Sequence, residues 1–271
     1  MFKFQKLSNY GTSTPAVART VFQARAIVDT FKCSDEQRDA LLGKLFDLQR
    51  HLLKCVECRD SLAGEIESER ANYAMPPLRS PGSRGAVTLP GVGDLQSKGD
   101  AFLQSAKLAI AAIGDMTEPF YGKGFGHKFH QFEKWTKEHF DPAGKFVTSV
   151  SRAIPFVKKI VQMRNVVDHP KSEPGAPMVY KNFDIGRSAD ALVLIDPTGG
   201  LTGEPLRPML QDFDQIIETI ITLGEQILVN LFDQFKRASM LVIDEIPVEH
   251  RDPAKPTRLY VTIAGHEAPL L

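Results

Sequence analysis

The chain is poor in cysteine, with only Cys33, Cys55 and Cys58 among its 271 residues. An odd number of cysteines in a chain this long does not suggest the disulfide framework of a small secreted domain. No window approaches the run of about 18 apolar residues that a membrane-spanning helix needs. The first residues, 1–6, also lack the apolar core of a signal peptide. These absences predict a cytoplasmic protein that does not enter a membrane.

Net charge is also lacking, because 33 basic residues balance 33 acidic ones. The balance hides a local asymmetry, however. Residues 123–171 contain ten Lys and Arg against four Asp and Glu, and residues 172–250 contain thirteen acids against five bases. The basic stretch is suited to binding a polyanion such as RNA. The alternative is that the acidic half folds against the basic half and neutralises it.

Apolar residues recur at helical spacing through most of the chain. Ser34 and Gln37 form a capping box, which predicts that a helix begins at residue 35. A further helix carries Pro155, where we expect a kink or a restart. The predicted helices span residues 15–32, 35–72, 100–118, 127–140, 143–168 and 209–238.

The helical pattern is interrupted in three places. Residues 76–99 are rich in Pro and Gly and predict a loop or linker. Residues 178–185 and 191–195 predict two strands that are joined by a turn around residues 186–188. Residues 240–246 and 258–263 have β-like composition and predict a short β-rich tail.

The predicted fold class is therefore mainly α, with a β-hairpin insertion and a short β-rich C-terminal tail. We expect N-terminal helices in residues 1–75 that pack on a helical domain of residues 100–240. That domain carries the hairpin at residues 178–195, and residues 241–271 form the tail.

The most informative stretch is R-N-V-V-D-H at residues 164–169, which ends an apolar-patterned segment and precedes Pro170. Such side chains suit cleavage of a phosphodiester. The guanidinium of Arg164 holds phosphate oxygens in a bidentate fork. Histidine, here His169, is the side chain type that ordinarily changes charge near neutral pH, so it can transfer protons. As an ordinary helix end, the same residues would instead form surface ion pairs and contact the last carbonyls of the helix.

The R-N-V-V-D-H motif resembles the R-x4-6-H signature of HEPN domains, in which a polar residue, often Asn, follows the Arg. The resemblance covers the motif and the helices around it. It implies an antiparallel bundle of four or five helices. It also implies a composite site at a twofold interface, which cuts single-stranded RNA without metal or another cofactor. Many HEPN domains belong to toxin–antitoxin or antiviral defence systems, so an antitoxin or other regulatory partner is implied as well.

The spacing of the motif also favours a homodimer. Five residues on an ideal helix place Arg164 and His169 about 140° apart, so one chain supplies only part of a site. Two copies that face each other bring two Arg and two His to one cleft. We assign phosphate binding to Arg164, proton transfer to His169, and orientation of Arg164 or the phosphate to Asn165. Asp168 is a supporting residue that holds the ring of His169.

Basic side chains around the motif are the candidates for further RNA contacts. These are Lys158, Lys159 and Lys171 near the motif, and Lys123 and His127 in the Gly-rich stretch of residues 122–127. That stretch joins two predicted helices and matches neither a P-loop nor a dinucleotide turn. Aromatic residues at 129–140 have helical spacing, which indicates core packing rather than stacking on bases.

The sequence also offers one alternative, a metal site. His51, Cys55 and Cys58 lie on one face of a predicted helix, and three such ligands suit zinc. Cys55 also continues an apolar ridge, and free cysteines are among the most buried residues. Core packing is the preferred interpretation, and no metal is predicted.

Three hypotheses for function follow from the sequence. The first is a HEPN-type endoribonuclease. The second is a HEPN-like module that binds RNA, a nucleotide or a protein without cleavage. The third is a helical interaction protein in which the motif is accidental.

Overall fold

The computed structural model describes residues 9–73, 88–168, 177–188 and 191–265. It is mainly helical with small antiparallel sheets, so the coarse fold class is confirmed. The chain forms two compact units that are interleaved in sequence. The first unit contains Met1–Leu53, Lys107–Lys158 and Glu218–Leu271, and the second contains Lys54–Ala106 and Lys159–Ile217. Each of the four long helices contributes residues to both units.

The N-terminal helix of the first unit is continuous but changes its winding. It comprises α1 (Pro15–Val17), a π-helical stretch η1 (Ala18–Gln23) and α2 (Ala24–Val28). The helix was predicted to extend to residue 32, but it ends at Val28. The reason is tertiary: the backbone N–H of Lys32 donates to the carbonyl of Phe235 at 2.5 Å, and Phe31 forms a β-bridge with Lys236.

Helix α3 (Asp35–Asn72) has the predicted bounds. The capping box is confirmed as well. The backbone N–H of Ser34 donates to Gln37 Oε1 at 3.1 Å, and the backbone N–H of Gln37 donates to Ser34 Oγ at 3.2 Å. This reciprocal pair satisfies two donors that a helix start leaves without an intrahelical acceptor.

Helices α4 (Leu95–Gly114) and α7 (Lys145–Asp168) differ from the prediction. Helix α4 begins inside the stretch that was predicted to be linker, and residues 74–87 of that stretch lie outside the described residues. Helix α7 runs through Pro155 as one element, so the helix does not restart there. The remaining short helices are α5 (Glu118–Tyr121) and α6 (Phe129–His139).

The strands of the second unit form two sheets instead of one hairpin. Strands β1 (Met178–Lys181), β4 (Thr198–Leu201) and β5 (Arg207–Pro208) form a three-stranded antiparallel sheet. Strands β2 (Asp184–Ser188) and β3 (Ala191–Ile195) form a separate hairpin.

The prediction of one strand over residues 178–185 with a turn at 186–188 was therefore wrong. The side chain of Asn182 divides that segment. Its Oδ1 accepts from the backbone N–H of Phe183 at 3.0 Å and from that of Val92 at 2.9 Å. Its Nδ2 donates to the carbonyl of Val92 at 2.9 Å. These bonds hold residues 182–183 against the segment before α4, so β2 starts anew in another sheet.

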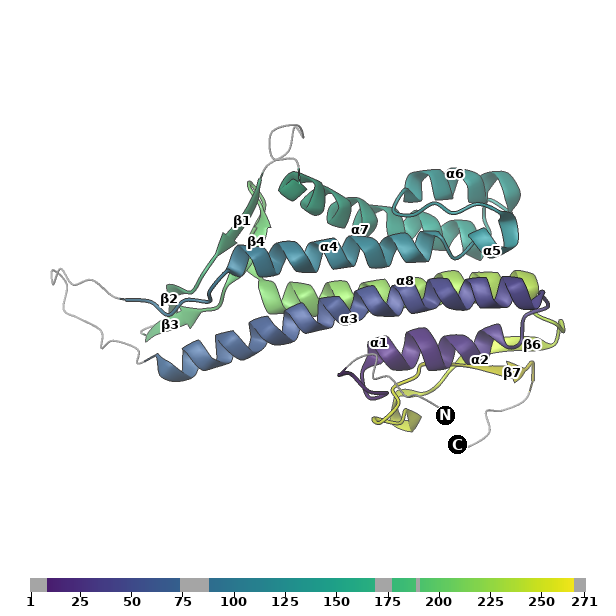
Figure 1. The fold of residues 1–271 in the computed structure, drawn as a ribbon, viewed down its shortest axis with the longest axis horizontal. Coiled ribbons are helices and arrows are strands. Elements are labelled where there is room, and N and C mark those ends of the chain that lie inside the picture. The colour runs from purple at the N-terminus through teal and green to yellow at the C-terminus, as the bar shows by residue number, and fades with distance from the viewer. Residues whose placement is uncertain (1–8, 74–87, 169–176, 189–190, 266–271) are drawn as a thin grey trace, which may run out of the picture. The chain divides into compact units, whose positions relative to one another are not determined.

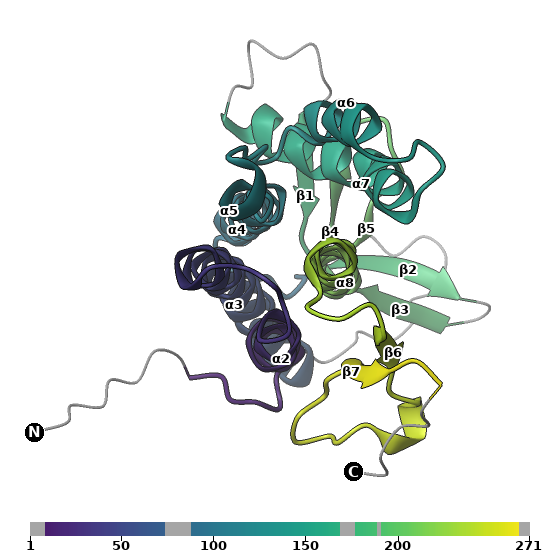
Figure 2. The same cartoon turned by 90° about the vertical axis from the view of Figure 1, so that its right-hand side faces the viewer.

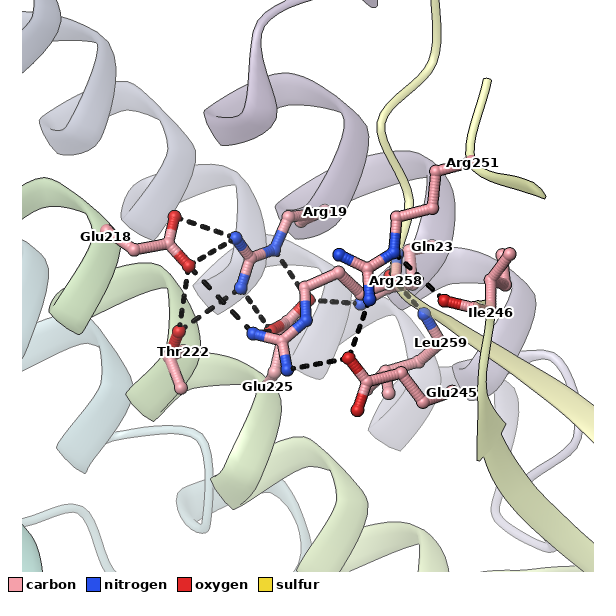
Figure 3. Close-up of polar contacts among 10 residues, drawn as sticks. All are labelled: Arg19, Gln23, Glu218, Thr222, Glu225, Glu245, Ile246, Arg251, Arg258 and Leu259. Carbon is pink, nitrogen blue, oxygen red and sulfur yellow. Dashed lines mark hydrogen bonds and ion pairs between the residues drawn. The ribbon is translucent and has the colours of Figure 1, made fainter. Parts of the chain in front are cut away.

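The predicted β-rich tail is an antiparallel pair in the first unit, formed by β6 (Leu241–Glu245) and β7 (Leu259–Ile263), with a short 3₁₀ helix η2 (Val248–His250) between them. Strand β7 contacts α2, and both views show α2 beside this pair (Figures 1 and 2). A polar link reinforces the contact. Gln23 Oε1 accepts from the backbone N–H groups of Arg258 and Leu259 at 2.6 and 2.8 Å (Figure 3).

Helix α8 (Met209–Phe235) is the most apolar of the described helices. It is long and apolar enough to cross a membrane by length and composition, with a mean hydropathy of 1.2 over its best window. In the structure 67% of that window is buried. Its apolar residues pack within the protein; in the second unit, for example, Phe213 stacks on Phe102 with ring centroids 3.6 Å apart. We therefore interpret α8 as a core helix.

Candidate functional site

Residues 164–168 of the motif are the last residues of α7, in the part of the helix that belongs to the second unit. Ile160, Met163 and Val166 are buried at helical spacing and fix this part of α7 against its neighbours. Arg164 and Asn165 are half-buried beside this apolar face. The Nε–H of Arg164 donates to Gln104 Oε1 on α4 at 2.6 Å. That bond fixes the orientation of the guanidinium.

A second polar pair consists of Asp100, one turn before Gln104 on α4, and Tyr180. The hydroxyl of Tyr180, on β1, donates to Asp100 Oδ1 at 2.8 Å. Burial raises the pKa of Tyr180, the hydrogen bond to Asp100 adds to the increase, and the charge of Arg164 acts in the opposite direction. The Tyr180 ring also packs on Gly99, where an added Cβ would lie 2.3 Å from the ring.

We call the four residues Asp100, Gln104, Arg164 and Tyr180 the Arg164 cluster. Three of its members, Asp100, Gln104 and Tyr180, were not among the residues predicted from the sequence. The only sequence signal was the spacing of Asp100 and Gln104, four residues apart within a helical pattern, which places both on one face. A cavity of about 20 Å³ lies beside Tyr180 and is also lined by Asp212, whose pKa burial raises. This volume holds little more than one water molecule.

The remaining motif residues are placed only in part. Asp168 is the last residue of α7, and nothing is described of its side chain. His169 and Lys171 lie outside the described residues. The assignment of proton transfer to His169 and the angle between Arg164 and His169 therefore stay predictions.

The candidate RNA contacts divide between the two units. Lys159, in the second unit, forms an ion pair with Glu204, so here an acidic residue from the C-terminal half neutralises a basic one. Lys158 belongs to the first unit and is exposed. Lys123 lies 5.3 Å from the centre of the Phe125 ring. Burial lowers the pKa of His127, and the nearby charges of Lys107 and Lys128 lower it further.

The three residues of the alternative metal site all lie on α3, and none of them is exposed. Cys55 is buried, and its Sγ lies 3.9 Å from the carbonyl oxygen of Phe102. Burial raises the pKa of both Cys55 and Cys58, which favours the neutral thiol over the thiolate that zinc binds. His51 has a pKa lowered by burial. Among the described residues, no group of three or more His, Cys, Asp or Glu is arranged to hold a metal.

The aromatic residues of α6 belong to the core of the first unit. Phe129, Phe132 and Trp135 are buried, and Phe132 stacks on Phe125 with ring centroids 4.7 Å apart. The rings are enclosed by protein, so the core interpretation of this segment is confirmed.

Compared with known proteins, the chain matches no family model, no curated protein and no solved structure significantly.

Proposed function

We propose that this protein is a metal-independent endoribonuclease of the HEPN type that cleaves single-stranded RNA. The observation that carries the proposal is the R-N-V-V-D-H motif at the end of α7, with Arg164 oriented by Gln104. The proposal includes a HEPN-like arrangement of the helices between about residues 100 and 238. It also includes a role as a toxin or in defence against phage, with an antitoxin or another regulatory partner.

The chemistry requires no group beyond the chain and its substrate. The 2′-hydroxyl of RNA attacks the neighbouring phosphorus, and the bond from phosphorus to the 5′-oxygen of the next nucleotide breaks. The products are a 2′,3′-cyclic phosphate and a 5′-hydroxyl. His169 transfers the proton, and Arg164 binds the phosphate and the charge that develops on it. Asn165 orients Arg164 or the phosphate.

The proposed site is composite and lies at a twofold dimer interface. Arg164 comes from the last turn and a half of α7, and the cavity beside the Arg164 cluster is too small for a nucleotide. A second copy would supply the other Arg and His of the cleft. Of the two adjacent basic candidates on α7, Lys159 already has an acidic partner in Glu204, whereas Lys158 is exposed.

The second candidate function is a HEPN-like module that binds RNA, a nucleotide or a protein without cleaving it. The same Arg164–Gln104 bond favours it, because a guanidinium that joins two helices contributes to packing as well as to any phosphate contact. The two candidates differ in whether His169 transfers a proton.

A single incubation separates the candidates. Purified protein is mixed with single-stranded RNA in excess EDTA, and the products are analysed for cyclic phosphate ends. The endoribonuclease gives fragments with 2′,3′-cyclic phosphate under these conditions. Cleavage that disappears in EDTA and returns with magnesium or manganese contradicts the mechanism. RNA that is bound but stays intact supports the binding module instead.

A further inference from the structure

A cavity of about 350 Å³ lies within the first unit, between the N-terminal half of α7, the middle of α8 and the start of β7. Small-molecule sites in proteins typically have volumes of about 300–1,000 Å³. The proposed ribonuclease mechanism makes no use of this cavity, whose lining residues all belong to the first unit.

The wall that α7 provides is cationic and polar. Lys145, Ser149 and Arg152 follow one another at spacings of four and three residues, so they share one helical face. The side chains of Lys145 and Arg152 are exposed and make no hydrogen bond or ion pair with any residue in the described part of the chain. Thr148 adds a hydroxyl to the same wall.

The opposite wall carries charges that already neutralise one another. Figure 3 shows Arg19, Arg251 and Arg258 linked with Glu218, Glu225 and Glu245, which makes three positive and three negative charges. Of these residues, Glu225 and Arg258 line the cavity. The Nε of Arg258 is buried and has no hydrogen-bond partner among the described residues.

The cavity therefore has two positive charges, those of Lys145 and Arg152, that form no ion pair with a carboxylate in the described part of the chain. A phosphate monoester carries a charge of about −1.5 to −2 at pH 7, which matches them. The guanidinium of Arg152 suits a phosphate fork, and Lys145 supplies a point charge. Gln226 and Asn230, one turn apart on α8, also line the cavity with amide groups. The Nδ2 of Asn230 donates to the backbone carbonyl of Gln226 at 2.7 Å, and its Oδ1 can accept from a hydroxyl group.

We propose that this cavity binds a small organic phosphate monoester, a molecule of the size and polarity of a sugar phosphate. Lys145 and Arg152 bind the phosphate, and Gln226 and Asn230 contact hydroxyl groups of the organic part. The site is distinct from the Arg164 cluster, and it adds a ligand that the RNA chemistry does not require.

Isothermal titration calorimetry on the full chain tests the proposal. The probes are ribose 5-phosphate, inorganic phosphate, ribose, and succinate as a dicarboxylate of similar charge. Ribose 5-phosphate should bind saturably with a Kd below about 1 mM, and each other probe should bind at least about tenfold more weakly. Equally tight binding of succinate or inorganic phosphate overturns the assignment to a phosphate monoester. Lack of saturable binding of ribose 5-phosphate up to about 10 mM overturns the site itself.

Paired charge-removing variants locate the binding. Lys145→Gln with Arg152→Gln should weaken ribose 5-phosphate binding by at least about tenfold, because both phosphate contacts are lost. Lys128→Gln with Lys134→Gln removes two exposed cations of the same unit that do not line the cavity, and it should leave the Kd within about twofold. Equal effects of the two double variants contradict the proposal. Circular dichroism checks that both double variants are folded. None of these binding measurements depends on RNA cleavage.

Discussion

Arg19 and Glu225 form a buried, two-pronged ion pair between the N-terminal helix and α8. The Nε of Arg19 donates to Glu225 Oε1 at 2.8 Å, and an Nη donates to Oε2 at 2.5 Å. The side chains are only 4% and 7% exposed. Gln23 donates a further bond to the same carboxylate at 2.6 Å. The pair joins residues 206 positions apart in sequence and connects the two ends of the first unit (Figure 3).

Removal of one partner of this pair should destabilise the protein strongly. Arg19→Met leaves the negative charge of Glu225 buried without the positive charge of Arg19 beside it. Such changes typically lower the free energy of unfolding by about 3–5 kcal/mol. The double variant Arg19→Met with Glu225→Met removes both charges and should recover much of that loss. Urea unfolding of the wild type and of the single and double variants measures the coupling. If the single variant costs less than about 1 kcal/mol, the pair is not a stabilising link.

Substitution of two helical glycines by alanine should change the stability of the protein in opposite directions. A Cβ at Gly114, the last residue of α4, would lie 1.9 Å from the carbonyl oxygen of Gly126, so Gly114→Ala must displace the following loop. We expect a loss of about 1–3 kcal/mol. Gly43, exposed in α3, has no atom within 4 Å of an added Cβ. Gly43→Ala should stabilise the protein by about 0.5–1 kcal/mol. Equal unfolding midpoints for the two variants would contradict the close approach.

Charge-preserving substitution at the motif should abolish most RNA cleavage. Arg164→Lys keeps the charge but loses the planar fork and the Nε–H that Gln104 accepts, so we expect a loss of at least about 100-fold. His169→Ala should lower the rate by about 10²–10⁴-fold. Cleavage rates and thermal midpoints are measured together, with Arg187→Lys, at an exposed position of β2, as the matched control.

The opposite pattern would identify an ordinary helix end. In that case both motif variants leave any activity intact, and Arg164→Lys lowers the thermal midpoint because the bond to Gln104 is lost. Cleavage that both variants retain at the wild-type rate would exclude the proposed roles of Arg164 and His169.

The protein should be a homodimer at micromolar concentration, because each chain supplies only part of the proposed site. Light scattering should give about twice the chain mass of 30.1 kDa. A strict monomer at these concentrations, together with retained cleavage, would show that the site is complete within one chain.

Mild acid should destabilise the first unit through two partly buried histidines. Burial lowers the pKa of His51 and His127 below that of the unfolded chain, about 6.5. The unfolded state then binds more protons, so this stability is complete above pH about 6.5 and is lost as the pH falls through the folded pKa values. The unfolding free energy of the wild type should fall between pH 7.5 and pH 5. His51→Gln and His127→Gln should each make that fall smaller, by less than about 1 kcal/mol. The exposed His130→Gln serves as the control.

Local interactions explain what the sequence determined by itself. The bounds of α3 follow from the capping box of Ser34 and Gln37 and from the apolar ridge behind it, which involve only residues within a few turns. The course of α8 and the strands of the tail follow from periodicity in the same way. The roles proposed for the R-N-V-V-D-H motif depend in the same way on residue types that are close in sequence.

Only the tertiary structure decided the features that depend on residues far apart in the chain. The N-terminal helix ends at Val28 because Lys32 bonds to Phe235, and one predicted strand becomes two because Asn182 bonds to Val92. Gln104 as the partner of Arg164, and Glu225 as that of Arg19, also come from other helices. Sequence periodicity shows which face of a helix is apolar, but it contains no information about which distant polar group will meet that face, because that pairing is set when the helices pack.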